Sequence, residues 1–163
     1  MKLAGAARHP TAMGKAYRLL IKFGNFLQSP LLLVMRLHWG WQLFLTGKGK
    51  LMNLDRTAGY FETLHIPLPK LNALMAGSTE CFGGLLLLLG LAARLVSIPV
   101  AFTMIIAYLT ADMEAVRSIF SDPDKFTSAA PFLFLLTAVV VLAFGPGCLS
   151  LDALIGRKFS KTV

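Results

Sequence analysis

Four long apolar stretches leave this chain few ways to fold. They lie at about residues 29–46, 71–91, 95–110 and 126–144. A helix needs about 20 residues to cross roughly 30 Å of hydrocarbon, so the four stretches take up about half of the 163 residues. We therefore predict an all-α protein, a bundle of four transmembrane helices, with no room for a second soluble domain.

The composition supports this prediction and excludes other classes of protein. Charged residues make up 15% of the chain, whereas ordinary soluble domains have about 25%. With 14 glycines, 8 prolines and 2 cysteines, the chain is neither collagenous, disordered nor rich in disulfides. Because Cys81 and Cys148 lack a CxxC spacing and are expected at different depths, we expect no disulfide between them.

The net charge of +8 gathers near the two ends of the chain. Five bases and no acid fall in the first 22 residues, and three more bases lie in 156–163. Counted by alternate sides of four spans, nine bases lie with the termini and six lie opposite. Bases beside spans are retained in the cytoplasm, so we expect both termini there. This distribution indicates a lipid bilayer as the partner and argues against nucleic acid.

The segments outside the spans carry weaker patterns. In residues 16–27, apolar side chains recur at helical spacing beside two bases, which fits an N-terminal interfacial helix and equally fits a helical extension of the first span. The long connection 47–71 predicts a short amphipathic helix in the first outer loop. We divide the chain into a basic segment, 1–28, a four-helix domain, 29–155, and a basic tail, 156–163.

Glu80 is the most informative single residue, because it lies near the middle of the second apolar stretch. An ionised carboxylate there needs a partner or a proton. Gly77 and Gly84 share its helix face, and Gly40 shares a face with Arg36 in the first stretch. Small residues let helices approach closely. We therefore expect these three glycines to pack the two helices together and to place Arg36 against Glu80.

Two interpretations of these polar residues stay open. Arg36 and Glu80 form a buried ion pair that fixes helix register, or Glu80 carries a proton and belongs to a quinone-head or metal site. His38 is able to relay protons or hydrogen-bond a quinone carbonyl, although an ordinary interhelical hydrogen bond is the commoner role. No spacing of His, Cys, Asp or Glu predicts a metal site.

Four fragments in a fixed order resemble one family. They are RLHWGWQLFLTGKGKL at 36–51, FETLHIPLP at 61–69, ECFGGLLLLLGLAAR at 80–94 and FGPGCLSLDALI at 144–155. Together they are similar to the DoxX family of small four-helix membrane proteins, over about residues 31–155. The positions that match the family are Arg36, Gly40, Gly47, Lys50, Phe61, Pro67, Glu80, Gly83, Gly84, Gly90, Arg94, Gly145, Pro146, Gly147, Ser150, Leu151 and Asp152.

The resemblance implies a function that the residues alone do not. It implies a bacterial inner-membrane subunit of a redox or stress-response complex, with quinone-linked electron transfer as one role and Glu80, Arg36 and His38 as the candidate catalytic residues. The cofactor is unknown, and quinone is the candidate. The alternative is a non-enzymatic membrane anchor or assembly factor for a partner protein. The small-residue faces also fit self-association.

Overall fold

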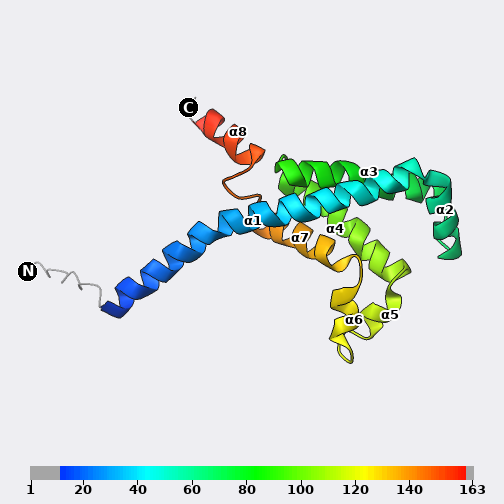
Figure 1. Cartoon of the computed structure of the whole chain (residues 1–163), viewed down its shortest axis with the longest axis horizontal. Helices are drawn as coiled ribbons and strands as arrows, with labels where there is room; N and C mark the ends of the chain where they lie inside the picture. The colour runs from blue at the N-terminus through cyan, green and yellow to red at the C-terminus, as the bar shows by residue number, and fades with distance from the viewer. Residues whose placement is uncertain (1–11, 161–163) are drawn as a thin grey trace, which may run out of the picture.

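The computed structural model describes residues 12–160, with side chains described over 17–158, and this part of the chain is all-α (Figure 1). The predicted all-α class is therefore confirmed. The helices, in chain order, are α1 (Ala12–Met52), α2 (Leu54–Thr63), α3 (Pro69–Leu89), α4 (Ala93–Thr110), α5 (Met113–Arg117), α6 (Pro123–Ser128), α7 (Phe132–Phe144) and α8 (Leu151–Ser160).

Four of these helices form the bundle. α1 packs along α3, α4 packs along α7, and α3 also contacts α4 (Figure 1). Trp39 of α1 meets Phe134 of α7 edge to face, with ring centroids 5.8 Å apart. The apolar core is drawn from all four helices and consists of Leu43, Leu87, Ala93, Val100, Met104, Ala138 and Val141.

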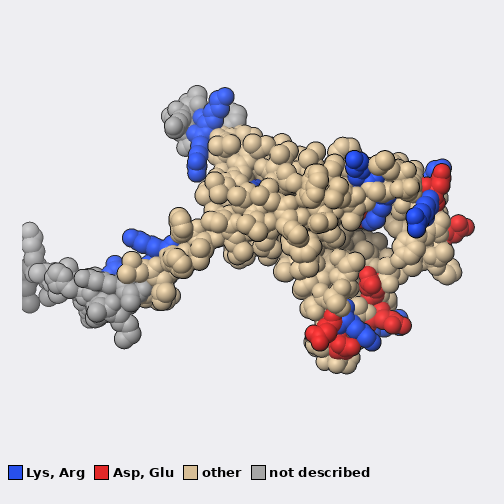
Figure 2. All heavy atoms as spheres, viewed as in Figure 1, with Lys and Arg blue, Asp and Glu red and all other residues tan. Residues whose placement is uncertain are grey.

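Two helices of the described chain, α3 and α4, are long and apolar enough to cross a membrane. α7 is apolar but has only 13 residues. In the view of Figure 2, few charged atoms lie over the middle of the molecule, only basic residues are visible on the N-terminal part of α1 and on α8, and mixed charges lie on α2 and around α5 and α6. Length and composition thus match two of the four predicted spans.

α1 differs from its prediction at both ends. It is one continuous helix of 41 residues, so it extends beyond both ends of the predicted first span, 29–46. A separate N-terminal interfacial helix is wrong for residues 12–28, and the helical extension is what forms. Pro30 removes one backbone donor without ending the helix. Residues 1–11 of the basic segment and 161–163 of the basic tail lie outside the described residues.

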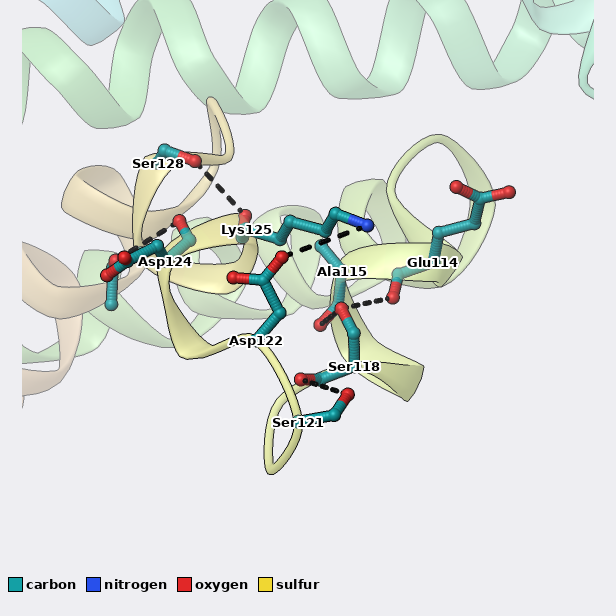
Figure 3. A network of polar contacts seen from close by, with 9 residues as sticks. Glu114, Ala115, Ser118, Ser121, Asp122, Asp124, Lys125 and Ser128 are labelled. Atoms are coloured by element: carbon teal, nitrogen blue, oxygen red, sulfur yellow. Dashed lines mark hydrogen bonds and ion pairs between the residues drawn. The ribbon is translucent and has the colours of Figure 1, made fainter.

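The last span also begins later than expected. α7 starts at Phe132 and not at Phe126, because the chain turns between α6 and α7 at Ala129 and Pro131. Proline has no N–H and disfavours a helical conformation in the residue before it. The preceding acidic loop holds two short helices (Figure 3), in which Ser118 Oγ donates to a carbonyl of α5 at 2.8 Å.

The predicted amphipathic helix of the first outer loop corresponds to α2. α2 has no buried residue and packs against α3. Outside the bundle, Lys70 Nζ donates to Asp55 Oδ1 at 2.9 Å and so links the start of α3 to α2. Hydrogen bonding to Lys70 lowers the pKa of Asp55 below its ordinary value. α2 is therefore held over one end of the α1 and α3 pair.

Candidate functional site

Glycines set how closely α1 and α3 approach. A Cβ added to Gly40 would lie 3.0 Å from the Gly84 carbonyl oxygen, and one added to Gly47 would lie 2.2 Å from the Cys81 nitrogen. A Cβ on Gly77 would meet a side chain of α1 at 3.0 Å. Neither backbone can withdraw without separating the helices, so these positions fix the antiparallel register of the pair.

That register gives Glu80 a different partner from the expected one. Lys50 Nζ donates a hydrogen bond to Glu80 Oε1, so Lys50 of α1 and Glu80 of α3 form an ion pair. The Glu80 side chain is 4% exposed and the Lys50 side chain 33%. Glu80 Oε2 is buried and has no hydrogen-bond partner. The carboxylate is thus held by one oxygen, and its other oxygen is buried without a hydrogen-bond partner.

The expected pairing of Arg36 with Glu80 is wrong. Arg36 lies beside Gly90, where an added Cβ would come within 1.8 Å of Arg36 Nη1. Gly90 follows Glu80 by ten residues, which is about 15 Å along α3. The residues on the two facing surfaces were predicted correctly, but the position of α1 relative to α3 along the helix axes was not. The glycine contacts, which determine that alignment, shift α1 along α3.

The Lys50 and Glu80 pair lies in the wall of a cavity. The cavity has a volume of about 690 Å³ and is lined mainly by α2, α3, α4 and the last turns of α1. This volume is within the range of small-molecule sites, about 300–1,000 Å³. Residues that line it include Thr46, Lys50, Asn53, Arg56, Thr57, Tyr60, Asn72, Met75, Thr79, Glu80, Phe102, Thr103, Ile106 and Thr110.

Four of the six hydroxyl groups around the cavity donate to backbone carbonyls, three of them to carbonyls of their own helix. Thr46 Oγ1 donates to the Leu43 carbonyl at 2.9 Å, and Thr103 Oγ1 donates to the Pro99 carbonyl at 2.9 Å. Among the described residues, Glu80 Oε2 is the one buried side-chain oxygen without a partner. The lining of the cavity is thus mostly apolar, and Glu80 is its one acidic residue.

Arg36 belongs to a second polar cluster at the opposite end of the bundle. It is fully buried, and its Nη2 donates to the Leu149 carbonyl at 2.7 Å, while Nε and Nη1 have no partner. Gly90, which ends α3 with φ +67°, leaves the space that the guanidinium fills. Any side chain at Gly90 would clash with Arg36 and adopt a disfavoured backbone conformation.

Asp152 holds this end of the bundle together. Its carboxylate accepts hydrogen bonds from the backbone nitrogens of Ala92 and Ala93 at 2.7 and 3.0 Å, at the start of α4. Its own nitrogen donates to the Gly90 carbonyl at 3.0 Å. Ser150 Oγ accepts a hydrogen bond from the nitrogen of Ala153 at 3.2 Å and so caps α8. Asp152 thus caps α4 from a distant segment of the chain.

The turn of Gly145, Pro146 and Gly147 connects α7 to this cluster. Both glycines have positive φ, 79° and 81°, which favours glycine over other residues. Arg94 Nη2 donates to the Ala143 carbonyl at 3.5 Å, beside this turn. These positions, which the family motif marks, lie far from Glu80. Their observed contacts are structural.

His38 lies in neither cluster. Its side chain is exposed on the outside of α1, and its ring meets Trp39 edge to face at 4.6 Å. It does not line the cavity. The structure therefore brings together neither His38 with Glu80 nor Arg36 with Glu80.

Sequence patterns did not identify the walls that α2 and α4 contribute. Thr103, Ala107 and Thr110 follow each other at helical spacing on α4 and line the cavity. Such a row of small and hydroxyl residues in an apolar helix is a signal for helix packing, and it does not by itself predict a cavity. On α2, Thr57 and Tyr60 are three residues apart, so they lie on one helix face, and both line the cavity.

Two comparisons with known proteins bear on this geometry. The model of the DoxX family matches residues 31–113. A protein of Bacillus subtilis (strain 168) named "Putative oxidoreductase CatD" is 30% identical over 128 residues, which are 77% of this chain and 89% of that protein. No solved structure matches the chain. The region that the family model matches contains Lys50, Glu80 and all the other residues that line the cavity.

Proposed function

The chain belongs to the DoxX family, as its sequence fragments predicted, and from this premise we propose that it binds the headgroup of a quinone-type lipid beside Glu80 as a subunit of a redox complex. The family and its relative link the chain to oxidoreductase function. The observation that carries the proposal is Glu80, which lines a largely apolar cavity and has one buried carboxylate oxygen without a hydrogen-bond partner.

The chemistry of the ion pair suits both redox states of a quinone. A carboxylate oxygen accepts a hydrogen bond from a hydroquinone hydroxyl, and an ammonium group donates one to a quinone carbonyl. When the hydroquinone is oxidised to the quinone, its two hydroxyl protons leave in turn through Glu80, and its two electrons pass to a redox partner protein of the complex. Lys50, which is partly exposed, then links Glu80 to water. Arg36 and His38 have no part in this step, because neither lines the cavity.

The cavity is accessible from the side of the bundle. Met75, Phe102 and Ile106 line it and are also 59%, 64% and 39% exposed on the outer surface. In a bilayer this surface faces lipid tails. A ligand with a polar head and a long apolar tail fits this arrangement, since its tail stays in the hydrocarbon while its head reaches Glu80.

The topology that accompanies this proposal has four spans, formed by the C-terminal half of α1 with α3, α4 and α7, in a bacterial inner membrane. The bases on the N-terminal part of α1 and on α8 lie at one end (Figure 2). Such bases favour the cytoplasmic side, so both termini are placed there. The cavity, near the other end of α1, then lies toward the outer surface.

Replacing Glu80 tests the proposal. We expect Glu80→Gln to abolish quinone-dependent electron transfer in membranes while the protein accumulates normally. Glu62→Gln is the matched control, because Glu62 is exposed on α2 and does not line the cavity. Normal electron transfer in Glu80→Gln at normal protein level would refute the proposal.

A second candidate function is that of a non-enzymatic anchor or assembly factor for a partner protein. The observation in its favour is Phe120, which is 97% exposed between α5 and α6. Purification in mild detergent from the native host, followed by mass spectrometry of bound lipid, quinone and protein, separates the two functions. If the protein is an anchor, it carries no quinone and co-purifies with a partner protein, which Phe120→Ser releases. If it self-associates, the co-purifying protein is a further copy of this chain.

A further inference from the structure

α8 starts at a fixed place relative to the two membrane-capable helices. Asp152, in its first turn, makes three hydrogen bonds to the turn between α3 and α4, through Gly90, Ala92 and Ala93. This turn is where both helices end on one side. If α3 and α4 cross a bilayer, the turn lies at its surface. The first turn of α8 is therefore held at the level of the membrane interface.

One exposed face of α8 is apolar. Leu151, Leu154 and Ile155 follow at spacings that place them on one side of the helix, and they are 37%, 58% and 45% exposed. Within the described chain, α8 makes no extensive contact with another helix, and Figure 1 shows it directed away from the bundle. An amphipathic helix at an interface buries such a face among lipid headgroups and the upper acyl chains.

The charges at this end favour an anionic lipid surface over a neutral or cationic one. Arg157 and Lys158 lie in the last turn of α8. Its one acid, Asp152, is engaged with the start of α4. The N-terminal part of α1 adds Arg18 and Lys22 with no acid, and Figure 2 shows bases alone on both segments. Basic side chains are attracted to anionic headgroups.

We propose that α8 is a surface helix that lies on the bilayer, with Leu151, Leu154 and Ile155 among the lipids and Arg157 and Lys158 on anionic phospholipid headgroups. The proposal is independent of the quinone site, because α8 does not line the cavity. It assigns the C-terminal helix a lipid contact that is separate from the spans.

Spin labels on opposite faces of α8 test its position in the full-length chain. The background carries Cys81→Ser and Cys148→Ser, and one label is attached at Leu154→Cys or at Gly156→Cys. These positions are about 160° apart on a helix, and a Cβ added to Gly156 meets nothing within 4 Å. Accessibility of each label to oxygen and to a water-soluble nickel chelate is measured in phosphatidylcholine vesicles with and without phosphatidylglycerol.

In vesicles with phosphatidylglycerol, we expect the ratio of oxygen accessibility to nickel-chelate accessibility to be several times higher for the label at position 154 than for the label at position 156. Equal accessibility of both labels in these vesicles would overturn the proposal. Native mass spectrometry of the unlabelled protein is the second measurement. Phosphatidylglycerol retention should fall about fivefold for each base changed by Arg157→Gln or Lys158→Gln, and unchanged retention would equally overturn it.

Discussion

Lys50 Nζ donates a hydrogen bond to Glu80 Oε1, which joins the last turns of α1 to the middle of α3. The ammonium group is partly exposed, while the carboxylate is almost fully buried. A buried charge of this kind depends on its partner far more than an exposed one does. The pair therefore has two roles in the protein, since it stabilises the helix contact and keeps a carboxylate at the cavity wall.

Removing the cation should destabilise the protein. Lys50→Met leaves the Glu80 carboxylate buried without its counter-charge, and we expect a loss of up to about 3 kcal/mol in the free energy of unfolding. Lys48→Met, two residues earlier on the exposed side of α1, should have little effect. Thermal unfolding in detergent measures both. Adding Glu80→Gln to Lys50→Met should restore part of the loss, and equal Tm values for Lys50→Met and Lys48→Met would contradict this role.

The α1 and α3 contact should be intolerant of a single methyl group at Gly84. A Cβ there would lie 2.4 Å from the Phe44 nitrogen, so Gly84→Ala must push the helices apart. Overpacking of this kind costs about 1–3 kcal/mol, measured as a lower Tm. Gly24→Ala is the matched control, because Gly24 lies on α1 with nothing within 4 Å of an added Cβ. A Gly84→Ala protein as stable as Gly24→Ala would show that the contact is looser than described.

Asp152 should stabilise the start of α4. Asp152→Ala removes both hydrogen bonds to the nitrogens of Ala92 and Ala93, and loss of a helix cap costs about 1–2 kcal/mol. Asp124→Ala, in the exposed first turn of α6, serves as the control. Amide hydrogen exchange should accelerate at the start of α4 in Asp152→Ala alone. Unchanged exchange there would rule out the capping role.

The tether between α2 and α3 should respond to acid. Lys70 lowers the pKa of Asp55 from its ordinary value of 3.8. Because the folded-state pKa is the lower one, the stabilisation is present above the unfolded-state pKa and is lost as the pH falls through the folded-state pKa. Carbon NMR of the Asp55 carboxyl measures this, and Lys70→Gln should raise the pKa toward its ordinary value. A pKa that Lys70→Gln leaves unchanged would contradict the link.

The helix faces of α1 and α3 could be predicted from sequence, but their axial alignment could not be derived from the apolar boundaries alone. Arg36 and Gly40 on one helix and Gly77, Glu80 and Gly84 on the other do face each other across the pair. The error came from placing the first span at 29–46, although α1 continues to Met52. Gly40 and Gly47 of α1 are seven residues apart, as are Gly77 and Gly84 of α3. Pairing these glycines in antiparallel order would have placed Arg36 near residues 88–90.

The C-terminal cluster was beyond what periodicity can predict. Asp152 caps α4 across 59 residues of chain, and no local pattern records such a partner. The break before α7, in contrast, could have been predicted from the sequence, because proline generally disfavours a helical conformation in the residue before it and Pro131 stands at this position. The cavity depends on how α2 and α4 pack against α3, so its walls could be recognised only after the tertiary arrangement was known.

The most direct test of the quinone site is photoaffinity labelling with an azido-quinone in native membranes. The proposal predicts labelled peptides from α3 and α4 that contain Met75, Phe102 or Ile106, which line the cavity. Excess unmodified quinone should compete with this labelling, and Glu80→Gln should weaken it severalfold while Glu62→Gln does not. Labelling confined to other helices, or equal labelling in wild type and Glu80→Gln, would contradict the proposed site.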